Sequence, residues 1–392
     1  MTQDLDSLKQ DVTKNVDRLE ERLKKIGHRI FENPELKFEE YKAMGWLTQE
    51  LEENGFEVER GAGGLETAFV GRCPRNDDSG PTLAYLCEYD ALPGLGHACG
   101  HNLIATIGLG AGLALCEVLD QLTGNLLVIG TPAEEGGGGK VELVNQGVFD
   151  EVDVAMMVHP SDKTLAGRGS LGIQELKMDF YGKASHASSK PEKGINALDA
   201  ALATFNNINA LREHMQESAR VHGIITDGGE KPNIVPEHAA ASFYVRSPEN
   251  EYLQELMDKV KQCAKAGALA AGAQVEFSSD GHPYKPMKPN PVLVRLFQNN
   301  LQFLGVGLDE PSGGMGSTDM GDVTQAVPGI HPYIKIVEEG VPAHSTEFAE
   351  AADSDRGYAA MITAAKALAL TAVEVLGNEE TYKEIQKAFK NA

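Results

Sequence analysis

Short apolar runs alternate with helical stretches between residues 82 and 158, and this alternation limits the possible folds more than any other feature. The runs are TLAYLC at 82–87, NLLVIG at 125–130 and DVAMMV at 153–158. Both faces of each run are apolar, which is typical of strands that are buried on both sides. A helix rich in small residues is expected at 102–121, between the first two runs. Strand, helix and strand in this order predict a mostly parallel sheet covered by helices.

The pattern of apolar and polar residues changes near residue 175. IQELKMDFYGK and AAASFYVRSP alternate apolar and polar residues, which is typical of strands with one exposed face. Helical patterns at 194–215 and 249–271 lie among these strands, and the small-residue helical texture returns after PMKPNP at 286–291. We therefore predict an α/β catalytic domain interrupted by a smaller α+β insert. The expected boundaries are 1–174 and 291–392 for the two parts of the catalytic domain and 175–290 for the insert.

Length and charge exclude several classes of partner. A chain of 392 residues is about right for two domains. Acidic residues outnumber basic ones by 58 to 35, and the formal net charge is -23. Such a surface repels phosphate backbones and anionic lipid, so we expect neither a nucleic-acid nor a membrane partner.

The cysteines and the N-terminus indicate a compartment. Five scattered cysteines are an odd number, which argues against a disulfide framework and for reducing surroundings. The polar N-terminus lacks the apolar stretch of a signal peptide. We therefore expect a cytoplasmic protein.

Polar side chains follow the predicted strands, where an open α/β sheet binds its ligands. They are Glu88, Asp90, Cys99 and His101 after the first run, Glu134 and Glu135 after the second, His159 after the third, and His344 after the apolar stretch 330–337. Singly, each has a simpler explanation: a solvated glutamate, a capping histidine or a buried apolar cysteine. Together, thiolate, imidazole and carboxylate groups at successive strand ends indicate a transition-metal site.

Other motifs compete with a metal site as explanations of the glycine-rich segments. GGGGK at 136–140 fails as a phosphate-binding loop, because Glu134 stands at the required glycine and Val141 at the required Ser or Thr. GLGAG at 108–112 lacks the third glycine of a dinucleotide fingerprint and does not follow a strand. Two alternatives stay open: a hydrolase that uses Cys99 as its nucleophile, and a non-catalytic binding protein on the same fold.

Several longer motifs carry a family resemblance. They are YDALPGLGHACGHN, GTPAEEGGGGK, MMVHP, GKASHASSKPEKGINALDAA, PNIVPEHAAASFYVRSP, GSTDMGDV and AHSTEF, and they span nearly the whole chain. In this order they resemble the metal-dependent aminoacylase/carboxypeptidase-type amidohydrolases. Within that family the chain is similar to the hippurate and auxin-conjugate hydrolases, and above all to the branch of p-aminobenzoyl-glutamate hydrolases and dipeptidases.

The resemblance implies two divalent metal ions in the catalytic domain. The implied ligands are Cys99, His101, Glu135, His159 and His344, with Glu134 as general base and Asp90 behind the ligands. Thiolate and imidazole favour zinc, although carboxylates admit manganese or cobalt. Asn102 departs from the aspartate that often follows the Cys-Gly-His unit, and we interpret it as a marker of the branch. The roles of Glu88 and His97 are not predicted.

The insert is implied to act as a lid and as the dimerisation domain of a homodimer. His186 would reach the active site of the partner subunit and stabilise the oxyanion. The implied substrate-binding residues are Asn233 and Arg246, which would hold a carboxylate, and Gly316 and Ser317, which would line the pocket.

These features predict a hydrolase that cleaves the amide bond of N-acyl amino acids or dipeptides. An amide is a poor electrophile and water a poor nucleophile, and a divalent metal helps both. Glu135 would coordinate while Glu134 accepts the proton of the water and passes it to the leaving nitrogen. The acyl group, the released amino acid and the physiological metal are not predicted.

Overall fold

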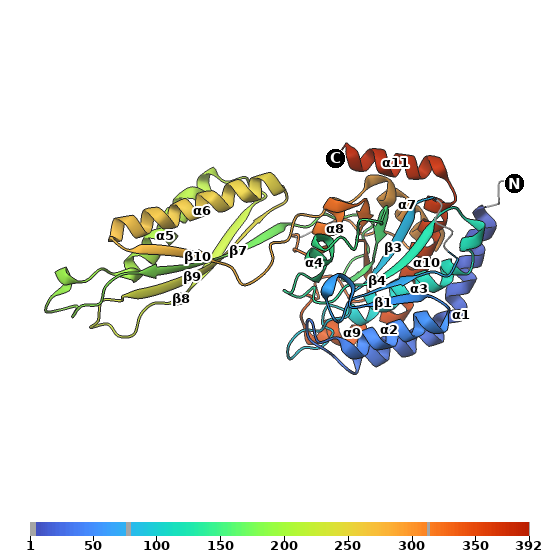
Figure 1. Ribbon diagram of the computed structural model, residues 1–392, viewed down its shortest axis with the longest axis horizontal. Helices are drawn as coiled ribbons and strands as arrows, with labels where there is room; N and C mark the ends of the chain where they lie inside the picture. The colour runs from blue at the N-terminus through green and yellow to red at the C-terminus, as the bar shows by residue number, and fades with distance from the viewer. Residues whose placement is uncertain (1–4, 76–79, 312–313, 392) are drawn as a thin grey trace. The chain divides into compact units, whose positions relative to one another are not determined.

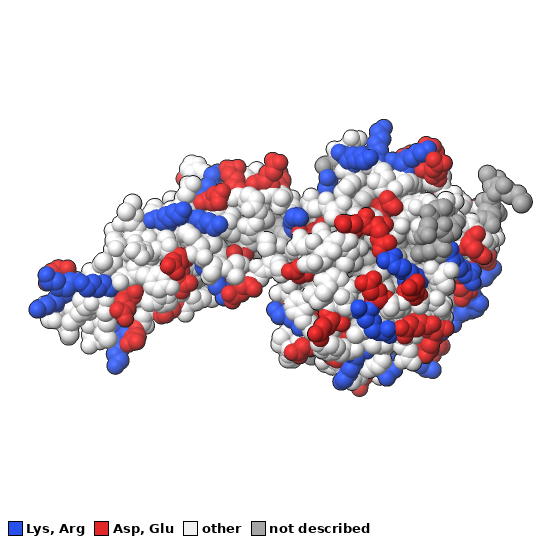
Figure 2. Space-filling model, viewed as in Figure 1, with Lys and Arg blue, Asp and Glu red and all other residues white. Residues whose placement is uncertain are grey.

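The computed structural model describes residues 5–75, 80–311 and 314–391. This part of the chain forms two compact units. Unit 1 comprises the described residues of Met1–Gly169, Lys288–Gly314 and Asp319–Ala392, and unit 2 comprises Ser170–Met287 and Met315–Thr318. Each unit has a hydrophobic core of its own. Acidic and basic side chains are interspersed over the visible face of each unit in Figure 2.

Unit 1 is built on a mixed sheet whose centre is parallel. Its order among the described residues is β1-β2-β4-β3-β5-β11. Strands β4, β3, β5 and β11 run parallel to one another, whereas β1 and β2 add antiparallel pairs at one edge. The bounds are β1 Glu57–Arg60, β2 Phe69–Arg72, β3 Thr82–Cys87, β4 Asn125–Gly130, β5 Val154–Met156 and β11 Gly329–Ile330. The predicted fold class is thus confirmed, and β1 and β2 are strands that the sequence pattern did not indicate.

Helices cover this sheet, and the most buried of them is α3, His101–Cys116. Every residue of α3 is buried, and it packs against α1, Leu5–Phe31, and α10, Asp355–Leu376. Small residues allow α3 to approach the sheet: a Cβ on Gly112 would lie 2.4 Å from Val128 Cγ2. The other helices of unit 1 are α2 Tyr41–Glu53, α4 Gly139–Asn145, α7 Pro291–Phe303, α8 Met320–Ala326, α9 Thr346–Ala352 and α11 Glu379–Lys390.

Helix α10 is long and apolar enough, by length and composition, to cross a membrane. Its most apolar window has a mean hydropathy of 1.7, but 78% of that window is buried inside the protein. Burial of this extent is typical of the core helix of a soluble domain.

Unit 2 is an antiparallel sheet with two helices (Figure 1). The strand order is β10-β7-β9-β8, and α5 and α6 pack against each other and against β7 and β9. Burial alternates along β7 and β9, because one face of the sheet meets the helices and the other stays open. The bounds are β7 Gly172–Tyr181, α5 Ala197–Leu211, β8 Arg220–Asp227, β9 His238–Ser247, α6 Asn250–Ala271 and β10 Gln274–Ser278.

Unit 2 includes a short segment that lies outside the predicted insert in the sequence. Met315–Thr318 belongs to it, although the sequence pattern places these residues in the catalytic domain. Hydrogen bonds explain the difference: the Leu171 amide donates to the Gly316 carbonyl (2.8 Å), and Arg246 Nη1 donates to Ser317 Oγ (2.9 Å). Such pairings depend on tertiary structure, which a sequence pattern does not contain.

A disulfide joins Cys73 and Cys116, whereas the scattered cysteines argued against a disulfide framework and for reducing surroundings. Cys73 directly follows β2, and Cys116 is the last residue of α3. Their Cα atoms are 6.0 Å apart, within the range that a disulfide spans. Counting cysteines could not reveal this pair, because 43 positions separate the two residues and only the fold brings them together.

Candidate metal centre

Asp90, in the segment after β3, orients the side chain of His101. His101 begins α3, and its Nδ1 lies 2.9 Å from the carbonyl oxygen of Asp90 and 3.0 Å from Asp90 Oδ1. The other oxygen of Asp90 accepts a hydrogen bond from the Glu135 amide (2.9 Å). Carboxylates that hold Nδ1 in this way orient a histidine so that its Nε2 can bind a metal. The predicted position of Asp90, behind the ligands, agrees with this geometry.

The loop after β4 carries Glu134 and Glu135 in a constrained backbone. Ala133 has φ of 60°, a conformation that costs a non-glycine residue energy. The buried Glu40 supports this turn, because its Oε1 accepts a hydrogen bond from the Ala133 amide (2.9 Å). Thr67 donates to the other carboxylate oxygen of Glu40 (2.7 Å). Glu40 was not predicted, because it stands on the loop between α1 and α2 and follows no apolar run.

Three predicted ligands, two from loops and one from the start of α3, lie together. Cys99, His101 and Glu135 each offer a donor atom, and these atoms lie within 4.8 Å of one another. His344 is next to them, with Nε2 3.3 Å from Glu135 Oε1 and φ of 63°. Within the described chain, His101 Nε2 and Glu135 Oε1 are buried without a hydrogen-bond partner. A thiol, two imidazoles and a carboxylate, with two of the donor atoms lacking a hydrogen-bond partner, fit a zinc-type site.

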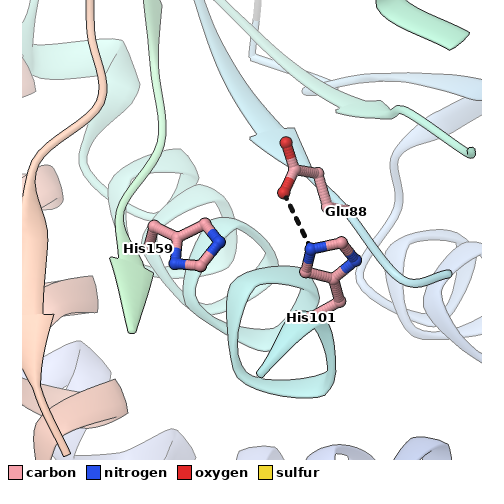
Figure 3. Close-up of side chains that lie close together, drawn as sticks. All are labelled: Glu88, His101 and His159. Atoms are coloured by element: carbon pink, nitrogen blue, oxygen red, sulfur yellow. Dashed lines mark ion pairs between the residues drawn. The ribbon is translucent and has the colours of Figure 1, made fainter. Parts of the chain in front are cut away.

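A second set of donor atoms overlaps the first. Glu88, His101 and His159 also place theirs within 4.8 Å of one another. Glu88 follows β3, and His159 begins the short strand β6, His159–Ser161, which pairs with β12, Tyr333–Lys335. Figure 3 shows Glu88 and His159 turned toward His101 from two different strands. His159 Nδ1 lies 2.6 Å from the Pro160 carbonyl, so its Nε2 is the atom left to bind a metal.

A buried lysine lies beside this second set. Lys140 Nζ is 2.5 Å from Glu88 Oε1 and 2.6 Å from Asp319 Oδ1, and all three side chains are fully buried. Burial alone lowers the pKa of an amine, but the carboxylates of Asp319 and Glu88 reverse this effect and raise the pKa of Lys140. In the sequence, Lys140 ends both the rejected phosphate-loop motif and the GTPAEEGGGGK motif, and no sequence signal indicates burial of a residue type that is usually exposed.

The pKa values of the two adjacent glutamates, Glu134 and Glu135, are shifted in opposite directions. Burial, and then the nearby carboxylates of Glu88 and Asp319, raise the pKa of Glu134 well above its ordinary value. Burial acts in the same direction on Glu135, but the neighbouring imidazoles of His344 and His101 outweigh it and lower the Glu135 pKa to about 2. Neighbouring groups whose pKa values are pushed apart are typical of sites where one holds a charge and the other moves a proton.

Two further buried histidines lie near the ligands. His331 links β11 to β12, and its ring centroid is 5.4 Å from that of His159. Burial and the neighbouring His159 lower the pKa of His331 to about 3. Burial and His101 similarly lower the pKa of His97 to about 4. His331 was missed because β11 contains only two residues, too few for a period to be visible.

The predicted substrate-binding residues and His186 lie in unit 2, where the structure brings Arg246 next to Ser317 and the segment of His186 next to that of Asn233. Arg246 on β9 bonds to Ser317, and Gly316 accepts from Leu171. The segments of His186 and Asn233 adjoin, because the amide of Ala187 donates to the Asn233 carbonyl (3.0 Å). His186 Nδ1 accepts from the Ser188 amide at 3.3 Å.

Comparison with known proteins identifies the family. The model of peptidase family M20/M25/M40 matches residues 85–369, most of the chain. The chain belongs to this peptidase family. This M20-family protein is therefore a hydrolase, and the resemblance carried by its motifs is confirmed.

Relatives and solved structures agree with this assignment. The M20-family protein is 40% identical to the Xaa-Arg dipeptidase of Mus musculus over 99% of its own length and 93% of the relative's. It is 36% identical to one of the p-aminobenzoyl-glutamate hydrolase subunits of Escherichia coli over 65% of its length and 57% of the relative's. Its fold matches that of the Bacillus subtilis protein YXEP, described as a dinuclear metal-binding M20 peptidase, with a TM-score of 0.72 at 22% identity. That match covers 92% of this chain and 99% of the other.

Proposed function

We propose that this M20-family protein hydrolyses the amide bond of dipeptides or N-acyl amino acids with two divalent metal ions, zinc above all. The observation that carries the proposal is the convergence of Cys99, His101 and Glu135 beside a second, electrostatically different glutamate. His159 and His344 would complete the ligands. When bound, a divalent cation lowers the pKa of a water molecule to about 7 and polarises the scissile carbonyl.

Glu134 is the proposed general base. Its raised pKa makes the carboxylate a stronger base than an ordinary glutamate, which favours acceptance of a proton. Glu134 accepts the proton of the attacking water and later donates it to the leaving nitrogen. Glu135, held in the ionised form by His344, stays a ligand throughout. The adjacency of the two residues keeps the proton acceptor beside the ligand set.

The environment of Cys99 argues against the alternative of a cysteine nucleophile. The side chain is 7% exposed, and burial followed by the carboxylate of Glu135 raises the pKa of the thiol above its ordinary value. A nucleophilic cysteine needs the opposite, an electropositive site that stabilises the thiolate. Cys99 is therefore a poor nucleophile unless a cation is bound to it, in which case it is a ligand.

The substrate proposal follows the names of the relatives. The mouse relative is named as a dipeptidase for Xaa-Arg, and the Escherichia coli relative as part of a p-aminobenzoyl-glutamate hydrolase. We therefore propose dipeptides with a C-terminal arginine as the first substrates to assay. Arg246 and Asn233 would bind the terminal carboxylate, His186 would stabilise the oxyanion across a homodimer formed by the insert, and Gly316 and Ser317 would line the pocket. We keep the cytoplasm as the proposed location, although the Cys73–Cys116 disulfide removes the cysteine count as an argument for it.

The test combines metal analysis with a substrate panel. The purified protein is stripped with a chelator and reloaded with zinc, manganese or cobalt, and each form is assayed on dipeptides and N-acyl amino acids. We expect activity to disappear on stripping and to return on reloading. Glu134→Gln should keep its metal and lose about 10²–10⁴-fold in turnover. The exposed Glu350→Gln is the matched control and should stay active. Near-normal turnover by metal-loaded Glu134→Gln would refute the role of Glu134.

A further inference from the structure

The loop that carries both glutamates of the proposed site starts from a strained residue, Ala133. Its backbone is left-handed, with φ of 60°, and both of its polar groups are hydrogen-bonded. The carbonyl oxygen accepts from the amides of Gly137 (3.1 Å) and Gly139 (3.4 Å), and the amide donates to Glu40 Oε1 (2.9 Å). A residue with a Cβ keeps this conformation only when its surroundings hold it there. The contacts of Ala133 therefore fix the start of the loop.

Glu40 reaches Ala133 from outside the loop, 93 positions earlier in the sequence. Its side chain is fully buried, and Thr67 Oγ1 donates to its other carboxylate oxygen (2.7 Å). The carbonyl of Thr67 in turn accepts from the hydroxyl of Tyr89 (2.6 Å), which directly precedes Asp90 in the chain. Because both of its oxygens are bonded to fixed partners, the Glu40 carboxylate is held against the Ala133 amide.

The two glutamates of the loop depend on this anchor to different degrees. Glu135 has a second anchor, because its amide donates to Asp90 Oδ2 (2.9 Å), and its carboxylate lies among the proposed metal ligands. A general base such as Glu134 is not held by a metal, so its position depends on the backbone that carries it. A displacement of about 1 Å in a reacting group can lower the rate about 10²-fold.

We propose that Glu40 is a positioning residue for Glu134: it holds Ala133 in the left-handed conformation and so places the general base. The inference rests on the proposed function only for the role of Glu134. The hold of Glu40 on the Ala133 amide can be measured without turnover, so the two proposals can fail separately.

The experiment compares Glu40→Gln with Glu40→Met, both loaded with metal. Glutamine keeps an oxygen for the Ala133 amide, and its NH₂ group can donate to Thr67 Oγ1. Methionine has a similar size and no comparable acceptor. We expect the Gln variant to keep a kcat close to that of the wild type. The Met variant should lose about 10²-fold in kcat, with metal content and KM little changed, because Glu40 is proposed to touch neither metal nor substrate. An undiminished kcat in the Met variant, or an equal loss in both variants, would overturn the inference.

A shorter side chain and a matched control complete the set. Glu40→Asp takes the place of the Met variant if that variant does not fold: its carboxylate is one methylene too short to reach Ala133 and Thr67 together, so kcat should fall. A kcat equal to that of the wild type would again overturn the inference. The control is Glu50→Ala on α2, which removes a partly buried carboxylate that pairs with Arg22 and should leave kcat unchanged. An equal loss of kcat in this control would reduce the effect of Glu40 to general destabilisation and overturn the inference.

Deuterium exchange of the Ala133 amide gives a second readout that needs no substrate. Exchange should be slow in the wild type and in Glu40→Gln, and several-fold faster in Glu40→Met, because the amide loses its acceptor. Equal exchange in the wild type and Glu40→Met would overturn the inference. A wild-type protein with a protected Ala133 amide and no metal-dependent hydrolysis would instead refute the proposed function, and the exchange comparison would still decide whether Glu40 holds the loop.

Discussion

The Cys73–Cys116 disulfide gives a sharp prediction about stability. It closes a segment of 43 positions between the end of β2 and the end of α3. Chain-entropy treatment of a loop of this length gives a stabilisation of about 4 kcal/mol, because the cross-link restricts the unfolded chain. The double variant Cys73→Ser/Cys116→Ser should therefore unfold at lower denaturant concentration. Its melting temperature should fall by roughly 8 °C, since each kcal/mol shifts a domain of this size by about 2 °C.

The assay compares oxidised and reduced protein as well as the variant. Reducing agent should lower the unfolding midpoint of the wild-type protein to that of the double variant and should leave the variant unchanged. Thiol titration of the unfolded, unreduced wild-type chain should detect three free thiols, those of Cys87, Cys99 and Cys263. Five free thiols, or equal midpoints for wild type and variant, would refute the pairing and its contribution to stability.

Three further predictions concern the site. Gly100→Ala should lower metal occupancy and reduce the free energy of unfolding by more than about 1 kcal/mol, because Gly100 has φ of 74° and a Cβ would lie 2.8 Å from Pro160 Cγ. Gly94→Ala is the control, because Gly94 has the same φ and no atom lies within 4 Å of the added Cβ. Equal metal loss in both variants would contradict the clash. Burial raises the pKa of Glu40 to about 7, so the native state keeps a proton that the unfolded chain releases. The free energy of unfolding should therefore fall by about 3 kcal/mol as pH rises from about 4.5 to about 7. Urea titrations of Glu40→Gln should lack this fall. Burial and then Glu135 raise the pKa of the Cys99 thiol, so zinc binding at neutral pH should release protons. The heat of zinc binding, measured by calorimetry, should therefore differ between buffers of unequal ionisation enthalpy. Identical heats would contradict thiolate ligation.

The parts of the fold and site that follow strand ends were predictable from the sequence. Apolar runs end where chain direction and polarity change; Glu135 and His159 lie within a few positions of those ends, and Cys99 and His101 lie in the segment that leads from β3 into α3. A parallel sheet brings such ends to one edge, which is why residues far apart in sequence could be grouped. The strands β3, β4 and β5 lie within the predicted runs for the same reason.

The remainder depends on tertiary contacts that leave no periodic signal. Glu40 supports the glutamate loop from a loop between two helices, and Asp319 reaches Lys140 across 179 positions of sequence. Strands β1 and β2 are four residues each, too short to be distinguished from loop. A buried lysine contradicts the ordinary preference of its residue type, and only its paired carboxylates make the burial possible.

Helix α3 joins the metal site to the disulfide. Its first residue is His101, its last is Cys116, and every residue between them is buried. A helix without an exposed edge cannot fray, so its backbone amides can exchange with deuterium only when the surrounding unit opens as a whole. Helix α3, which carries the proposed ligand His101, therefore stays folded as long as unit 1 does. The rate of amide exchange in α3 would measure the opening of unit 1.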